Sequence, residues 1–116
     1  MKIFVLGVPY TMDYREKSEV PALEKCNGYC DVTTKAIVVK DFTEEEKQDV
    51  LRVADLEAFK HKCLRHEIVH AFLYESGLCF NTLDLEGAWA TNEEMVDWMA
   101  IQGPKIYAAW MEAKCL

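Results

Sequence analysis

The stretch from Thr43 to Ser76 contains neither glycine nor proline, and it therefore predicts a long helical region. A capping box begins it, in which the Thr43 side chain caps an amide one turn ahead and Glu46 reaches back. Because one helix of this length would be long for a small protein, we expect a break before Asp55, which serves as a second N-cap. The second helix then ends near Ser76, where Gly77 suits the position that follows a helix.

Strands are expected on the N-terminal side of this region. Met1–Val8 is rich in branched and aromatic residues and predicts a strand that Pro9 ends, while residues 11–20 predict a loop or short helix. The clearest strand is Lys35–Lys40, and we expect it to pair as an antiparallel hairpin with Tyr29-Cys30. The Asn27-Gly28 pair before it indicates a turn or bulge.

After the long helical region we expect a loop over residues 78–90 and a last helix from Asn92 to about Ile101. Gly103-Pro104 should interrupt that helix, which then continues over Ile106–Ala113. Without a repeat or linker, residues 1–116 form a single domain. The predicted fold class is α+β, with a small antiparallel sheet packed on the central helix and a further helix at the C-terminus.

Charge and cysteine content exclude several classes of function. The chain carries 13 basic and 20 acidic residues, a net charge of −7, and residues 66–116 contain only Lys105 and Lys114 as bases. Such a chain lacks a basic surface for nucleic acid, and its acidic half should favour cations and basic substrate segments. The apolar run Ile3–Val8 is too short to span a membrane. Five cysteines without a CxxC pair predict reduced thiols in a cytoplasmic protein.

The central helix carries the motif HExxH, formed by His66, Glu67 and His70. Residues at i and i+4 share one helical face, so both imidazoles can bind one Zn²⁺ ion. Glu67 follows the first ligand and is placed to take a proton from a zinc-bound water. The surrounding residues are apolar, and two histidines and a glutamate on a buried helix would be costly unless paired or bound to metal.

A catalytic zinc site needs a third protein ligand from another element. Glu93 and Asp97 lie four residues apart at the start of the last helix and share a face. We predict Glu93 as the third ligand, with Glu94 as the alternative. Asp97 would then accept a hydrogen bond from a ligand imidazole and orient it.

HExxH followed by a helix with the pattern Asn-Glu-x-x-x-Asp, here Asn92 to Asp97, resembles the gluzincin metallopeptidases. The chain is most similar to minimal single-domain gluzincins and to small phage or prophage-encoded metallopeptidases, over residues 29–105. The resemblance implies a zincin-like fold and a zinc-dependent endopeptidase that acts on a peptide or protein substrate. For a phage protein the compartment is the host cytoplasm. The alternative function is a catalytically silent zinc-binding interaction or phage accessory protein on the same fold.

The resemblance also raises expectations for three other parts of the chain. By position, Lys35–Lys40 would be the strand whose exposed edge pairs with an extended peptide. An oxyanion-stabilising group is expected from a later segment, and Tyr74 and Tyr107 are the two candidates. Cys115 near the C-terminus could bind the open zinc position and keep the enzyme latent; a free thiol in the tail is the alternative.

Overall fold

The chain begins with a β-hairpin, where the sequence predicted a single strand. In the computed structural model, which describes residues 1–48, 54–80 and 93–116, β1 (Lys2–Val5) and β2 (Val8–Arg15) are antiparallel neighbours. Leu6 (φ 50°) and Gly7 (φ 84°) form the two-residue turn between them, and positive φ at both positions is typical of a type I′ hairpin. The prediction of one strand over Met1–Val8 was therefore wrong, because the apolar run hides the turn.

The sheet has four strands in the order β1-β2-β4-β3, and it is mixed. β3 (Gly28–Asp31) and β4 (Ala36–Lys40) form the predicted antiparallel hairpin. β4 also pairs with β2, and that pairing is parallel. The expectation of a purely antiparallel sheet was thus wrong, since the segment between β2 and β4 returns the chain to the same end of the sheet.

The same pairing places β4 in the middle of the sheet. Ala36–Lys40 is bonded to β2 on one side and to β3 on the other, so the predicted exposed edge at Lys35–Lys40 was wrong. The exposed edges are β1 and β3. β3 is the edge strand that contacts the long helix α2 (Leu56–Glu75).

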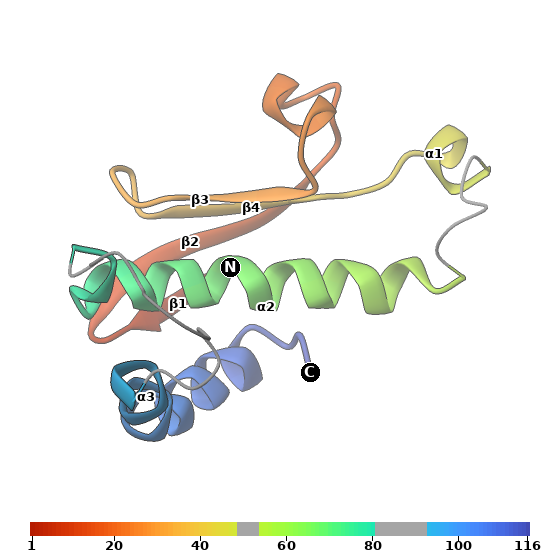
Figure 1. Ribbon diagram of the computed structural model, residues 1–116. Helices are drawn as coiled ribbons and strands as arrows, with labels where there is room; N and C mark the ends of the chain where they lie inside the picture. The colour runs from red at the N-terminus through yellow and green to blue at the C-terminus, as the bar shows by residue number, and fades with distance from the viewer. Residues whose placement is uncertain (49–53, 81–92) are drawn as a thin grey trace.

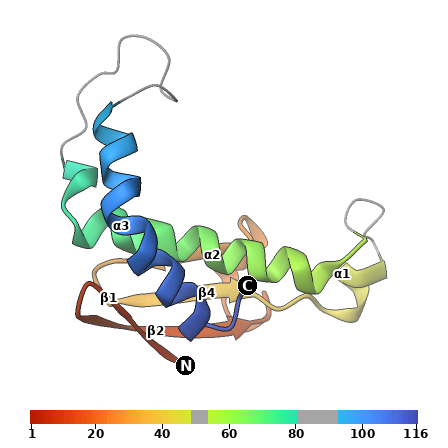
Figure 2. The same cartoon turned by 90° about the horizontal axis from the view of Figure 1, so that it is seen from below.

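Helices α2 and α3 (Glu93–Glu112) cover one face of the sheet, with α2 against β3 and β4 and α3 beside β1 (Figures 1 and 2). Alternate strand residues point into the core between them, as the two-residue period of a half-buried strand requires. The sheet contributes the buried side chains Ile3, Val5, Tyr10, Met12, Ile37 and Val39, and α2 contributes Leu64, Ile68, Ala71 and Phe72. No helix in the described part of the chain has the length and apolarity to cross a membrane.

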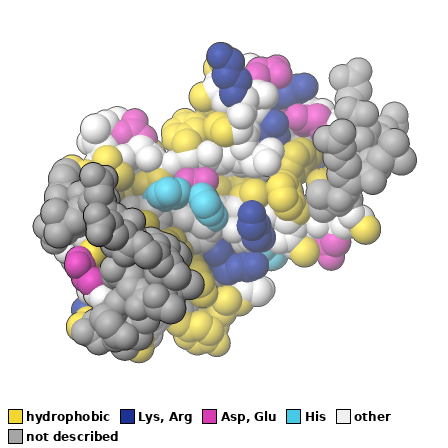
Figure 3. Space-filling model, in the orientation of Figure 1, with side chains coloured by type: hydrophobic (Ala, Val, Ile, Leu, Met, Phe, Trp, Pro, Cys, Tyr) yellow, Lys and Arg dark blue, Asp and Glu magenta, His cyan; other side chains and the backbone are white. Residues whose placement is uncertain are grey.

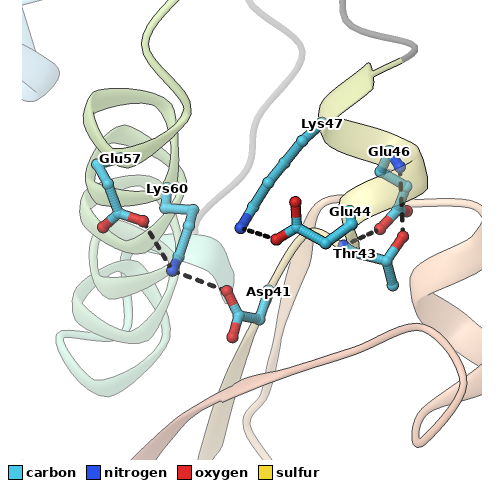
Figure 4. A network of polar contacts seen from close by, with 7 residues as sticks. All are labelled: Asp41, Thr43, Glu44, Glu46, Lys47, Glu57 and Lys60. Atoms are coloured by element: carbon cyan, nitrogen blue, oxygen red, sulfur yellow. Dashed lines mark hydrogen bonds and ion pairs between the residues drawn. The ribbon is translucent and has the colours of Figure 1, made fainter.

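Both predicted helix starts in the long helical region are confirmed, and Figure 4 shows the first, the capping box of Thr43 and Glu46. Before the short helix α1 (Glu44–Gln48), the Thr43 amide donates to the Glu46 carboxylate over 2.7 Å, and the Glu46 amide donates to the Thr43 hydroxyl over 3.3 Å. At the start of α2, Asp55 accepts a hydrogen bond from the Ala58 amide. Each cap satisfies amides that have no partner inside the helix.

Two helix ends complete the fold. Gly77, with a φ of 82°, follows the end of α2 as predicted. The predicted interruption of the last helix at Gly103-Pro104 was wrong, because α3 runs through Pro104 without a break. A proline ring disfavours helical geometry in the residue before it mainly through that residue's Cβ, and Gly103 has none. The short 3-10 helices η1 (Pro21–Glu24) and η2 (Leu78–Phe80) lie in the connections.

Candidate metal centre

The imidazoles of His66 and His70 point to a common position beside α2. Their Nε2 atoms lie 3.0 Å apart, and the rings meet edge to face with centroids 4.7 Å apart. Both side chains are exposed, and Figure 3 shows histidines together near the middle of this face with an acidic side chain directly beside them. Two ring nitrogens at this distance need a proton or a cation between their lone pairs.

Glu67 lies on the inner side of the two histidines, where α2 meets β3. Its side chain is 8% exposed, and no described residue forms a hydrogen bond to its carboxylate. It packs against Gly28, where a Cβ atom would lie 3.4 Å from Glu67 Oε1. Burial raises the pKa of Glu67, and the neighbouring His66 and His70 partly oppose this rise. The carboxylate oxygens face the cavity and keep some contact with solvent, so a cation or a water molecule can reach them.

The three residues line a cavity of about 490 Å³ between the edge strand and α2. One wall comes from the sheet edge and the other from the last turns of α2. The remaining lining residues are Gly28, Tyr29, Cys30, Val32, Leu73, Tyr74 and Cys79. The cavity is therefore bordered by the edge of β3, whose outer backbone groups have no neighbouring strand within residues 1–48, 54–80 and 93–116.

The Cys30 thiol forms part of the wall next to Glu67. Burial raises the pKa of this thiol to about 12, with the nearby Glu67 and Asp31 carboxylates adding to the effect. A thiol with this pKa stays protonated at neutral pH and is a poor nucleophile and metal ligand. The Cys30 thiol is therefore not assigned a chemical role in the cavity.

The predicted third ligand falls on a part of the site that the structure does not describe. Glu93 and Asp97 belong to α3, but their side chains lie outside the described residues. Glu94 is described and exposed. Among the described side chains, no group of three or more His, Cys, Asp or Glu is arranged to hold a metal ion. The start of α3 is tied to the end of α2 by Trp98, whose indole N–H donates to the Ser76 hydroxyl over 3.0 Å.

The two tyrosine candidates lie in different surroundings. Tyr74 lines the cavity, one turn after His70, and the Lys35 ammonium lies 4.7 Å from the centre of its ring. Tyr107 is 55% exposed on α3 and is not part of the cavity wall. Tyr29 on the edge strand is a further phenol in the wall that the sequence analysis did not single out. The predicted hairpin of Tyr29-Cys30 with Lys35–Lys40 and the Asn27-Gly28 turn signal placed Tyr29 on this strand, but nothing in the sequence linked it to the histidines.

Cys115 is not at the site. It is fully buried in the core, its thiol lies 3.5 Å from the Trp110 carbonyl oxygen, and its own carbonyl accepts from Arg65. All five cysteines are free thiols, as predicted. The suggestion that Cys115 folds back onto the histidines was therefore wrong, because apolar packing of the C-terminal tail holds it elsewhere.

A polar cluster fixes the end of α2 to the sheet close to the cavity. The Glu75 carboxylate accepts from the Tyr10 hydroxyl over 2.7 Å and from the Lys35 ammonium. Burial disfavours the charged Glu75, but these two donors outweigh it and lower its pKa. The cluster thus links β2, through Tyr10, and the turn before β4, through Lys35, to the last turn of α2.

No protein family, curated protein sequence or solved structure matches this chain. The assignment of the site therefore depends on its chemistry. Two Nε2 atoms that bind one tetrahedral zinc at 2.0–2.1 Å lie roughly 3.3 Å apart. The observed 3.0 Å is within a few tenths of an ångström of that value, and the buried Glu67 carboxylate stands beside the pair. The spacing of these two donors matches that of a zinc-bound pair, and the described side chains supply no third ligand.

Proposed function

We propose that the protein is a zinc-dependent metallopeptidase, with His66 and His70 as zinc ligands and Glu67 as the general base. The observation that carries the proposal is the 3.0 Å approach of the two Nε2 atoms next to a buried carboxylate that has no hydrogen-bond donor among the described residues. Glu93 is the proposed third ligand and Asp97 the residue that orients an imidazole, with Glu94 as the alternative ligand.

Zinc, when bound, would supply a Lewis acid that polarises the peptide carbonyl and makes water more acidic. The reaction then depends on Glu67. Its carboxylate accepts a proton as water oxygen adds to the carbonyl carbon, and it returns that proton to the amine as the C–N bond breaks. The raised pKa of Glu67 suits the first of these steps, because a more basic carboxylate takes a proton from water more readily.

The edge strand β3 is the proposed platform for the substrate backbone. An extended peptide can add to the exposed edge of Gly28–Asp31 as a further strand, which would carry its carbonyl groups past His66 and Glu67. Tyr74 and Tyr29 line the same cavity and are the described phenols that can donate to a developing oxyanion.

The rival function is zinc binding without turnover, as in an interaction or phage accessory protein. The variant Glu67→Gln separates the two, because it removes the base and leaves both histidines in place. For a peptidase we expect zinc-loaded wild type to cleave an unstructured protein such as casein, and Glu67→Gln to lose at least about a hundredfold in rate at equal zinc content. Equal zinc with no cleavage by the wild type would favour the rival.

A further inference from the structure

A second cavity opens on the other side of Glu67, toward the start of α2. Its volume is about 200 Å³, and it shares Gly28, His66 and Glu67 with the first cavity. The two cavities are therefore neighbours at the seam between β3 and α2, and Glu67 lines both. A peptide bound with its cleaved bond at Glu67 would have a neighbouring residue within reach of the second cavity.

The second cavity carries a lysine ammonium without an ion-pair partner among the described residues. Lys62 lines it and is exposed, and within the described part of the chain its ammonium forms no ion pair or hydrogen bond. Its one described contact is with the Phe59 ring, whose centre lies 5.9 Å from Nζ. Lys60, two residues earlier, differs sharply: its ammonium binds Asp41 at 2.9 Å and Glu57 at 3.3 Å (Figure 4).

The rest of the wall suits a short side chain that ends in a charge. Phe59 and Cys63 supply an apolar floor. Asn27 lies at the rim, and its side-chain amide has no hydrogen-bond partner among the described residues, while its backbone carbonyl is held by the Lys40 amide at 2.9 Å. A lysine ammonium and an amide N–H₂ are both donors, and an apolar stem with a carboxylate at its end fits between them.

We propose that this second cavity is a specificity subsite for a carboxylate of the peptide substrate, which Lys62 and Asn27 bind. The inference rests on the proposed peptidase function for its position next to the cleaved bond. Glu67 also lines the cavity and would repel an anion, so the proposal places the carboxylate beside Lys62. This reverses the expectation, drawn from the acidic second half of the sequence, that basic segments are preferred.

Two sources can supply the carboxylate: an acidic side chain or the free C-terminus of a peptide. The test uses three fluorescent alanine-based heptapeptides. One has a central glutamate and an amidated end, one has a central glutamine and an amidated end, and one has neutral side chains and a free C-terminal carboxylate. Fluorescence anisotropy measures their Kd for the full chain carrying Glu67→Gln, which prevents cleavage, with and without zinc.

We expect at least one carboxylate peptide to bind about fivefold more tightly than the glutamine peptide, the size of a charge-assisted contact at a half-open site. Lys62→Gln should abolish the difference. Lys2→Gln is the matched control, because Lys2 is an exposed lysine on β1, at the opposite edge of the sheet from β3. It should leave the difference unchanged. The peptide that shows the preference identifies the source of the carboxylate.

Equal Kd values for all three peptides, no binding of any peptide at millimolar concentration, or the same loss in Lys62→Gln and Lys2→Gln would overturn the subsite. Zinc content is measured on the same samples and reports on the proposed function separately. A carboxylate preference without zinc binding keeps the subsite and removes the peptidase. Zinc binding without a carboxylate preference removes the subsite and leaves the peptidase proposal standing.

Discussion

Gly28 and Glu67 are in such close contact that a methyl group at position 28 would lie 3.4 Å from the Glu67 carboxylate and 3.1 Å from the Val38 carbonyl oxygen. Val38 belongs to the central strand β4 and has little freedom to move. We therefore predict that Gly28→Ala lowers the free energy of unfolding by about 1 kcal/mol, because β3 must shift to relieve the 3.1 Å contact with Val38, and that this shift against Glu67 slows peptide hydrolysis. Zinc content should stay at the wild-type level. Urea denaturation and a peptidase assay check this, and wild-type values in both would contradict the contact.

We expect Glu67 to destabilise the zinc-free protein. Its carboxylate is 8% exposed without a hydrogen-bond donor among the described groups, and burial raises its pKa. We predict that Glu67→Gln raises the free energy of unfolding of the zinc-free protein by about 1 kcal/mol at pH 7, since it removes a buried charge. Thermal denaturation in the presence of a chelator measures this.

The matched control is Glu16→Gln, because Glu16 is an exposed glutamate in the connection after β2. Its substitution should change stability by less than about 0.5 kcal/mol. If Glu67→Gln and Glu16→Gln change stability equally, or if Glu67→Gln lowers it, the Glu67 carboxylate already has a hydrogen-bond or solvent partner in the zinc-free protein.

Tyr74 lines the cavity beside His70, and its phenol is a candidate donor to the oxyanion. For Tyr74→Phe we predict a fall in kcat of about a hundredfold, with KM and zinc content nearly unchanged, because the lost hydrogen bond forms mainly in the transition state. Tyr107→Phe is the control, since Tyr107 is exposed on α3 outside the cavity. A wild-type kcat in Tyr74→Phe would show that Tyr74 does not stabilise the oxyanion, and would leave Tyr29 as the described tyrosine to test next.

Glu75 should make stability depend on pH. The Tyr10 hydroxyl and Lys35 ammonium hold its pKa below the ordinary value despite the opposing effect of burial. A lowered native pKa means that the unfolded chain binds the proton more tightly, so this stabilisation is present above about pH 4.5 and is lost as pH falls. We predict that Glu75→Gln costs about 1–2 kcal/mol at pH 7 and much less at pH 3. Urea denaturation at both pH values measures this, and a cost independent of pH would contradict it.

Local signals in the sequence predicted helix ends well. The capping box of Thr43 and Glu46, the Asp55 cap and the glycine after α2 all act within one turn of the backbone, and all three are confirmed. The β3–β4 hairpin is also local, and Asp31 supports its turn by accepting from the Thr33 and Thr34 amides. Such interactions do not depend on the rest of the fold.

Long-range pairing could not be predicted from the sequence. The parallel contact between β2 and β4 joins Thr11 to Ala36 across a segment that contains η1 and β3, and no residue pattern encodes it. It decides that β4 is central and that β3 is the edge beside the cavity. For the same reason the motif predicted the two imidazoles and Glu67, but not Tyr29, Cys30 or the Lys62 cavity, which depend on where the sheet meets α2.

The central claim is that His66 and His70 hold a zinc ion. The most direct test is the metal content of the full chain purified without chelator or added metal, measured beside His70→Ala and a Lys2→Gln control. We predict about one zinc per chain in the wild type and in Lys2→Gln, and its loss in His70→Ala. No zinc in the wild type, or the same zinc content in His70→Ala, would contradict the account.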